Sequence, residues 1–270
     1  MRKRSQRSEA DAAAGDRQFI TALARGLDVL RAFRPSDGPL GNQELAARTG
    51  LPKATVSRLT YTLAKLGFLD YIAAAGKYRI GIPALGLGYA CLGGFSIRDM
   101  AQPMMQALAD HAGDGALVGL GGRDDLAMIY LAAARSAGLV SLQLDVGSRI
   151  SLRRSGMGWA YLAAASPEER DALLPRLRAR TGEEQWPRLV DSMDRAAREI
   201  KTRGFCINMG EWNAQIASVA VPLRLADSSL PLMVLNCGGP AYLMAQERLE
   251  NDLGPRLLGL ARSIASARGG

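Results

Sequence analysis

The sequence predicts an α+β protein with two domains, a small one near the N-terminus and a larger one after it. Three short segments with apolar residues three and four apart, followed by two strand-like runs around a small-residue turn, fill residues 19–81. Within residues 96–268, strand-like runs are interspersed with longer amphipathic segments. The 270 residues, 48% of them hydrophobic, are enough to bury a core in each domain.

The positive charge of the chain is concentrated in its first third. The net charge is +8, and residues 1–90 contain 14 Lys and Arg against 7 Asp and Glu, whereas the remainder contains 20 against 19. This asymmetry favours a polyanionic partner for the N-terminal third, with a basic tail that only aids solubility as the alternative. Residues 1–18, rich in Arg, Ser and Ala, predict a disordered basic arm.

Several classes of protein are disfavoured by composition. The chain has no run of about 18 apolar residues, and its basic N-terminus lacks the apolar stretch of a secretory signal. We therefore expect a cytoplasmic protein that does not contact a membrane. Cys91, Cys206 and Cys237 are far apart, which disfavours a disulfide framework or a structural zinc site. We expect neither a metal nor a cofactor.

Two helices begin the small domain. The first is marked by apolar residues at helical spacing: Ile20, Leu23, Leu27 and Leu30. The turn over residues 35–39, with two prolines and a glycine, ends it. In the second helix, Asn42 is the expected N-cap, Leu45 faces inward, and Gly50 marks the end.

A third helix and a hairpin complete the small domain. The helix starts near Pro52 and stops at Gly67. Its expected buried stripe consists of Val56, Leu59, Leu63 and Leu66. The runs 68–72 and 77–80, around the turn 73–76, predict a β-hairpin. Two helices joined by a tight turn and followed by a hairpin are typical of a winged helix-turn-helix, to which we assign residues 19–81.

The outer face of the third helix has residue types that contact DNA. They are Lys53, Ala54, Thr55, Ser57, Arg58 and Tyr61. The first residues of a recognition helix meet base edges in the major groove, where Arg58 can reach a base and Tyr61 a phosphate. Lys77 and Arg79 share one side of the hairpin and suit neighbouring phosphates or the minor groove. An ordinary solvated face is the alternative interpretation.

A helix over residues 82–95 is expected to link the two domains. In the larger domain, helices are expected at 97–111, 158–165, 167–177, 186–203 and 243–267, the last with a kink at Pro255. Strands are expected at 117–120, 126–132, 140–144, 205–209, 217–223 and 232–236. The glycine-containing segment 121–125 is expected to be the turn between the first two strands.

No catalytic constellation stands out. His111 is the only histidine, so a Ser-His-Asp triad would depend on it alone, and neither a Gly-x-Ser-x-Gly elbow nor a phosphate-binding Gly-Lys-Ser/Thr loop occurs. We therefore expect a protein that is not an enzyme. A small-molecule-binding enzyme with a basic accessory domain is the alternative.

A small-molecule pocket is better supported than an active site. A helix opens with Ser155, Gly156, Met157 and Trp159, and its N-terminus, with Arg153 just before it, could hold a carboxylate. Polar and aromatic residues follow in a second segment: Asn208, Glu211 and Trp212. Asn236 and Cys237 end a predicted strand. Such groups, if they converge, are typical of a ligand site.

Five stretches of the sequence resemble the IclR (isocitrate lyase regulator) family of bacterial transcription factors. In the small domain and linker they are "ALARGLDVLRAF", "QELAARTGLPKATVSRLTYTLAKLGFLD" and "GKYRIGIPALGLG". In the larger domain they are "VGSRISLRRSGMGWAYLAAASPEERDALL" and "RGFCINMGEWNAQIASVAVPL". The resemblance extends from Thr21 to about Ala267.

The resemblance implies a fold and a function. Residues 96–268 would form a GAF-like effector-binding domain, in which the segments above, with Ser218, surround one cavity. The protein would bind double-stranded promoter DNA as a homodimer or homotetramer and respond to a small organic acid, an aromatic acid among the candidates. Glu211 and residues 218–220 match the family pattern. Arg153 replaces a frequent histidine, Asn208 an acidic or serine residue, and the usual ending is lost at Arg224 and Leu225.

Overall fold

A computed structural model of the chain describes residues 18–34, 36–138, 142–225 and 230–267. Its internal contacts divide it into two compact units, with the boundary between Gly94 and Phe95. The expected arm over residues 1–18 lies outside the described residues, apart from Gln18. No helix in the described part of the chain is long and apolar enough to cross a bilayer.

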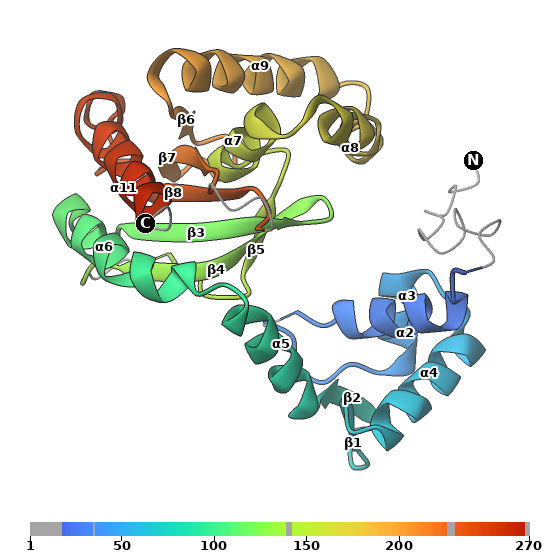
Figure 1. Cartoon of the computed structure of the whole chain (residues 1–270). Coiled ribbons are helices and arrows are strands. Elements are labelled where there is room, and N and C mark those ends of the chain that lie inside the picture. The colour runs from blue at the N-terminus through green and yellow to red at the C-terminus, as the bar shows by residue number, and fades with distance from the viewer. Residues whose placement is uncertain (1–17, 35, 139–141, 226–229, 268–270) are drawn as a thin grey trace. The chain divides into compact units, whose positions relative to one another are not determined.

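The first unit consists of helices and one hairpin (Figure 1). Its elements are α2 (Thr21–Arg31), α3 (Asn42–Thr49), α4 (Lys53–Lys65), β1 (Leu69–Ile72), β2 (Lys77–Ile80) and α5 (Pro83–Gly93). The two strands pair antiparallel, with Leu69 opposite Ile80. This order of three helices, hairpin and a further helix confirms the predicted winged helix-turn-helix.

The core of the first unit is small. Its buried apolar residues are Val29, Leu40, Leu45, Leu51, Val56 and Leu69. The helix predicted from the spacing of Ile20, Leu23, Leu27 and Leu30 forms as α2, but Leu23 is 61% exposed and Ile20 and Leu27 are exposed as well. A periodic stripe shows that a helix has an apolar side but does not show what covers it. The same reason applies to Leu66 at the end of α4, which is also exposed.

The N-terminus of α3 differs from the prediction, and its C-terminus agrees with it. Gly41, not Asn42, is the N-cap residue, and its N–H donates to Glu44 Oε2 at 2.6 Å. Asn42 instead accepts a hydrogen bond from the buried Thr60 hydroxyl at 3.0 Å, which joins α3 to α4. Gly50 ends the helix as predicted, with φ 71°, a left-handed conformation that favours glycine.

The second unit is built on a six-stranded antiparallel sheet with the order β5-β4-β3-β8-β7-β6. Its strands are β3 (Leu117–Asp124), β4 (Ala127–Arg135), β5 (Arg149–Ser151), β6 (Cys206–Met209), β7 (Ile216–Leu223) and β8 (Met233–Pro240). Because β3 and β8 are central, side chains from β4, β3, β8 and β7 can converge on one face of the sheet.

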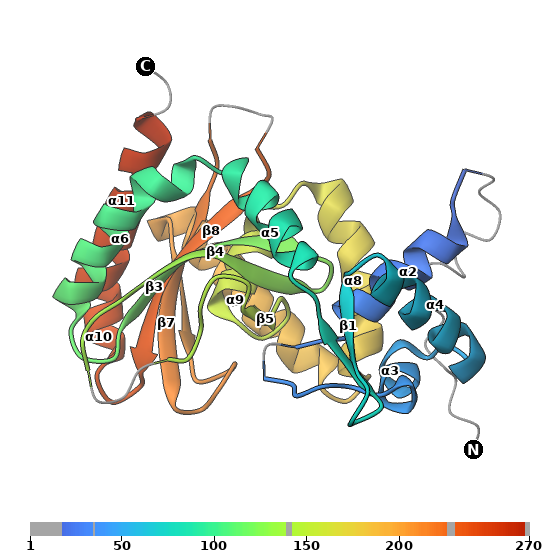
Figure 2. The same cartoon turned by 90° about the horizontal axis from the view of Figure 1, so that it is seen from below.

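Helices cover both faces of this sheet (Figures 1 and 2). One face packs on α6 (Ile97–Ala112), the π-helical turn η1 (Leu249–Leu253) and α11 (Gly254–Ser266), and the short α10 (Gln246–Arg248) precedes η1. The other face packs on α7 (Gly156–Ala164), α8 (Pro167–Thr181) and α9 (Trp186–Arg203). Each layer has its own apolar core, so the sheet separates two faces that can serve different purposes.

Several predicted boundaries in this unit are wrong. Residues 121–124 belong to β3, and the turn is confined to residues 125–126. Gly121 pairs with β4 and β8 within the strand, and a side chain does not fit there because the Met157 sulfur lies 2.6 Å from the position of its β-carbon. Residues 142–144 are not a strand, residues 140–141 lie outside the described part, and the short third strand is β5. The last helix is interrupted at η1, the turn just before Pro255, so the break expected at this proline is confirmed.

Candidate DNA-binding helix and effector pocket

Helix α4 buries one side and presents the other to solvent. Val56 and Thr60 are fully buried. The residues expected to contact DNA lie on the opposite side: Lys53, Ala54, Ser57, Arg58 and Tyr61 are exposed, and Thr55 is half-buried. Tyr61 is 63% exposed, and the Lys65 ammonium lies 5.5 Å from its ring centroid.

The cations at the start of α4 are available to an anion. Within the described residues, neither the Lys53 ammonium nor the Arg58 guanidinium has an ion-pair or hydrogen-bond partner. The N-terminal turn of the helix also presents backbone N–H groups that lack intrahelical acceptors. This end of α4 therefore combines side-chain and backbone donors, as a contact to a phosphate requires.

The two cations of the hairpin are already paired. The Lys77 ammonium lies 3.2 Å from the Glu44 carboxylate, and Arg79 Nε donates to Asp70 Oδ2 at 3.1 Å. The pKa of Glu44 is lowered, first by the Gly41 N–H and then by Lys77. A phosphate approaching the hairpin would compete with these carboxylates, which distinguishes Lys77 and Arg79 from Arg58.

The second unit contains a small cavity at the N-terminus of α7. It is lined by Tyr130, Leu142, Leu144, Ile150, Ser155, Gly156, Met157, Asn208, Trp212, Ile216, Ser218, Asn236 and Gly238. The centre of a water molecule can range over about 20 Å³ there, which is room for about one water. The cavity is therefore closed to an organic acid unless its wall moves.

The structure divides the expected pocket residues into two groups. Those in the cavity wall are Ser155, Gly156, Met157, Asn208, Trp212, Ser218 and Asn236. Those outside the wall are Arg153, Trp159, Glu211 and Cys237. The wall group comes from four separate parts of the chain, which the sheet and the start of α7 bring together.

Arg153, Trp159 and Cys237 make their contacts outside the cavity wall. The Arg153 guanidinium donates to the Thr181 hydroxyl at 3.2 Å, and desolvation and two neighbouring arginines lower its pKa. Trp159 is buried between α7 and α9, and its Nε1 donates to the Arg153 carbonyl at 2.8 Å. Cys237 is buried on the opposite face of the sheet, where desolvation raises its pKa to about 12.

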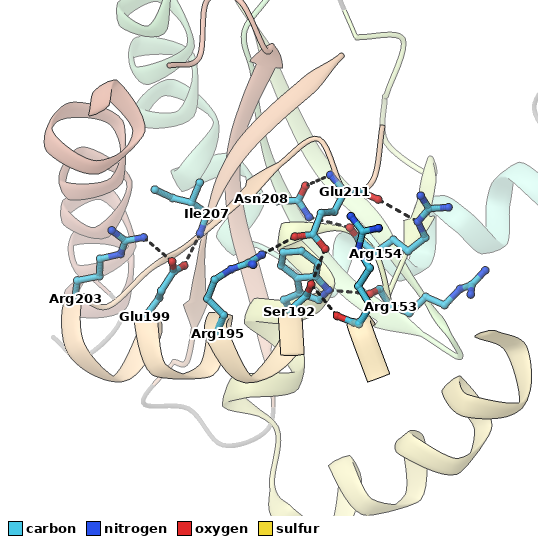
Figure 3. A network of polar contacts seen from close by, with 11 residues as sticks. Arg153, Arg154, Ser192, Arg195, Glu199, Arg203, Ile207, Asn208 and Glu211 are labelled. Carbon is cyan, nitrogen blue, oxygen red and sulfur yellow. Dashed lines mark hydrogen bonds and ion pairs between the residues drawn. The ribbon is translucent and has the colours of Figure 1, made fainter. Parts of the chain in front are cut away.

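Asn208 holds two segments of the cavity wall together (Figure 3). Its Nδ2 donates to the Arg154 carbonyl at 2.8 Å, and its Oδ1 accepts from the Glu211 N–H at 3.1 Å. Arg154 Nε in turn donates to the Glu211 carbonyl at 3.0 Å. The turn before α7 and the loop between β6 and β7 are thus fastened to each other.

The Glu211 carboxylate fastens the same loop to α9. It accepts from the Ser192 hydroxyl at 2.7 Å and from the Arg195 guanidinium at 2.5 Å (Figure 3). The next residue, Trp212, is half-buried and forms part of the cavity wall. Glu211 therefore sets the position of a wall residue without lining the cavity itself.

Sequence reasoning missed six residues of the wall: Tyr130, Leu142, Leu144, Ile150, Ile216 and Gly238. Most of them are apolar and are indistinguishable from core residues in a sequence. Tyr130 could have been found from the glycines of the neighbouring strand, because a glycine inside a strand often marks a close approach of another group. Gly119 is such a glycine, and the Tyr130 ring lies over it.

No metal centre is apparent in the part of the chain that the structure describes, where no three His, Cys, Asp or Glu residues are grouped to hold an ion. The single histidine, His111, contacts Asp252 of η1, with 3.0 Å between Nε2 and Oδ2. It lies on the face of α6 that meets η1, and it does not line the cavity.

Known proteins resemble this chain over most of its length. The profile of the IclR helix-turn-helix domain matches residues 22–72, and that of the bacterial transcriptional regulator IclR C-terminal domain matches residues 89–266. The HTH-type transcriptional regulator TsaQ1/TsaQ2 of Comamonas testosteroni is 33% identical over 91% of this chain and 87% of its own.

Solved structures agree in fold. The crystal structure of an IclR family transcriptional regulator from Brucella abortus has a TM-score of 0.85 and 45% identity, and covers 94% of this chain and 95% of that one. An IclR homolog from Microbacterium hydrocarbonoxydans, complexed with 4-hydroxybenzoate, has a TM-score of 0.67 and 23% identity, over 92% of this chain and all of that one.

Proposed function

The chain belongs to the IclR family of bacterial transcriptional regulators, and we propose that it regulates a promoter in response to a small organic acid. The proposed compartment is the cytoplasm, where promoter DNA is found. The curated relatives of this chain are transcriptional regulators, which are not enzymes. The observation that carries the proposal is the presence, on one chain, of a cationic recognition-type helix and a separate buried pocket with polar walls.

The proposed DNA contacts are divided between bases and phosphates. Ala54 and Ser57 are small enough to let the α4 backbone approach the major groove, and Arg58, which has no partner among the described residues, is placed to reach a base edge. Lys53, Thr55 and Tyr61 would contact phosphates. Lys77 and Arg79 would do so only after exchanging their carboxylate partners for phosphate oxygens.

The proposed effector site is the cavity at α7. Its wall is mostly apolar with a few polar groups, and the N-terminus of α7 favours a negative charge. A family member bound to 4-hydroxybenzoate supports an aromatic acid as one candidate. To admit such a ligand the wall has to move, and we propose that the loop that carries Trp212 does so, with Arg153, Trp159 and Glu211 as supports rather than contacts. We assign Cys237 to the core.

The proposed assembly is a homodimer, alone or within a homotetramer. Helix α5 has no buried residue; its exposed Leu85 and Tyr89 and the exposed Ile82 just before it are three and four positions apart. Leu23 and Leu27 leave an apolar side of α2 exposed too. Exposed apolar area of this kind on a single chain is typical of an interface. Two copies would present two α4 helices to half-sites about one helical turn of DNA apart.

Binding to the DNA upstream of the gene tests the proposal. We expect the purified chain to bind this fragment at low salt, with an affinity that falls as salt rises. Arg58→Ala should weaken binding by about 1–3 kcal/mol, roughly 5- to 150-fold, and relax the sequence preference. Arg198→Ala, the same change at an exposed site in the second unit, is the matched control. No binding at low salt, or equal effects of the two variants, would contradict the proposal.

A further inference from the structure

The floor of the cavity is formed by two polar side chains from the strands on either side of β3. Tyr130 of β4 is 2% exposed and Asn236 of β8 is 7% exposed. Both lie over Gly119 of β3, where a β-carbon would be 2.1 Å from Tyr130 Cε1 and 2.7 Å from Asn236 Oδ1. Glycine at this position therefore allows the phenol and the amide to meet inside the cavity.

These two side chains satisfy each other only in part. Asn236 Nδ2 donates to the Tyr130 hydroxyl oxygen at 3.3 Å, while Asn236 Oδ1 is buried with no hydrogen-bond partner among the described residues. In this arrangement the phenol hydrogen also has no acceptor within the described part of the chain. Turning the amide over would pair the phenol with Oδ1 and leave Nδ2 unpaired instead. An open hydrogen-bonding position therefore remains in both orientations.

A buried polar group without a partner destabilises a folded protein, so natural proteins usually complete it with water or a ligand. The cavity has room for about one water molecule next to this pair. Water donates and accepts at once, and an alcohol or phenol hydroxyl is the ligand group that does the same. The floor thus offers a ligand hydroxyl both an acceptor, Asn236 Oδ1, and a donor, the Tyr130 phenol.

The floor is also unsuited to a charged group. None of the residues that line the cavity is Asp, Glu, Lys, Arg or His. Desolvation raises the pKa of Tyr130 to about 12, and the same burial would penalise an ionised ligand carboxyl beside it. The charge of an acid is better placed at the N-terminus of α7, where Gly156 and Met157 present N–H groups and line the cavity.

Building on the effector function proposed above, we propose that the effector is a hydroxy acid. Its carboxylate would meet the N-terminus of α7, and its hydroxyl would donate to Asn236 Oδ1 while accepting from the Tyr130 phenol. Tyr130 and Asn236 would then determine specificity, because an acid without the hydroxyl leaves Asn236 Oδ1 and the phenol hydrogen without partners. The apolar residues of the wall would cover the carbon skeleton in between.

Matched pairs of acids that differ by one hydroxyl test this inference on the full chain. Suitable probes are benzoate with 3- and 4-hydroxybenzoate, phenylacetate with 4-hydroxyphenylacetate, and butyrate with 3-hydroxybutyrate, measured by calorimetry and thermal shift. We expect the hydroxylated member to bind at least about tenfold more tightly in every pair with measurable binding. Tyr130→Phe and Asn236→Leu should bring the ratio close to one, with little change in the affinity for the plain acid.

Tyr242→Phe is the matched control, because this tyrosine is 77% exposed and does not line the cavity; it should keep the wild-type ratio. Retained affinity for the plain acid shows that the second unit of a floor variant is folded. Acids that bind without preference for the hydroxyl, or a preference that survives both floor variants, would overturn this inference and leave the effector function standing. If no acid of the panel binds while DNA does, the effector function and this inference fail together.

Discussion

At the scale of single residues, the cavity floor requires glycine at position 119. A β-carbon there would overlap both the Tyr130 ring and the Asn236 amide. We expect Gly119→Ala to lower the free energy of unfolding by about 1–3 kcal/mol because the two side chains must shift within a packed layer. Urea denaturation measures this value.

The control for Gly119 is another glycine of the same unit. Gly259 lies within α11, and nothing is within 4 Å of its missing β-carbon. Gly259→Ala should therefore stabilise the protein by about 0.5–1 kcal/mol, since alanine is the better helix former. Equal effects at the two glycines would show that the floor is not closely packed.

The floor pair itself should cost stability in the unliganded protein. We expect the double variant Tyr130→Phe/Asn236→Leu to be at least as stable as wild type, because it removes an incompletely paired polar pair and leaves apolar groups of similar shape. Thermal unfolding without added acid is the measurement. A loss of more than about 2 kcal/mol would mean that the pair is a structural hydrogen bond rather than an incomplete ligand site.

Some residues of the site could be predicted from the sequence and others could not. Ser155, Asn208 and Asn236 could be selected in advance because they are polar residues next to apolar runs that predict a helix or a strand. Tyr130 and Ile150 could not, because an inward side chain on a strand looks the same in a cavity wall and in a core. Arg153 precedes α7 as expected, yet its long side chain turns to Thr181, a choice that only packing decides.

At the scale of secondary-structure elements, helices were more predictable than strands. Gly50 and Gly204 end α3 and α9 in the left-handed conformation, a local rule that sequence displays directly. The lengths of β3 and β8 depend on neighbouring strands: both continue through glycines that a sequence presents as turn signals. The π-helical turn η1 lies just before Pro255, the residue from which the sequence predicts a break in this helix.

One ion pair makes the packing of α3 sensitive to pH. Arg48 donates to Asp37 Oδ1 at 3.0 Å and to the Ala32 carbonyl at 2.8 Å. The bond from Arg48 is the main cause that lowers the pKa of Asp37 below its usual 3.8. A lowered carboxyl pKa contributes stability above the unfolded value and loses it as pH falls through the folded value.

We therefore expect the first unit to lose stability as pH falls below about 4, and Arg48→Gln to reduce that dependence. Arg58→Gln removes a charge with no carboxylate partner in the described structure and should keep the wild-type pH dependence. Denaturant unfolding between pH 6 and pH 3 compares the three proteins. Identical pH profiles for wild type and Arg48→Gln would contradict this assignment.

At the scale of the whole molecule, the exposed apolar face of α5 connects the fold to assembly. Leu85→Asp places a charge in the proposed interface, so we expect a shift from dimer or tetramer toward monomer in light scattering after gel filtration. Gln43→Asp adds the same charge at an exposed position of α3 and should leave the oligomeric state unchanged. A Leu85→Asp protein with wild-type mass would place the interface elsewhere.

The central claim is that acid binding and DNA binding are coupled, and linkage gives its most direct test. The affinity of the full chain for the upstream DNA should be measured with and without an acid that stabilises it, and the affinity for that acid with and without DNA. We predict that the acid changes the affinity for DNA by about 5- to 150-fold and that DNA changes the affinity for the acid by the same factor. An acid that binds the chain and leaves its affinity for DNA unchanged would contradict the account.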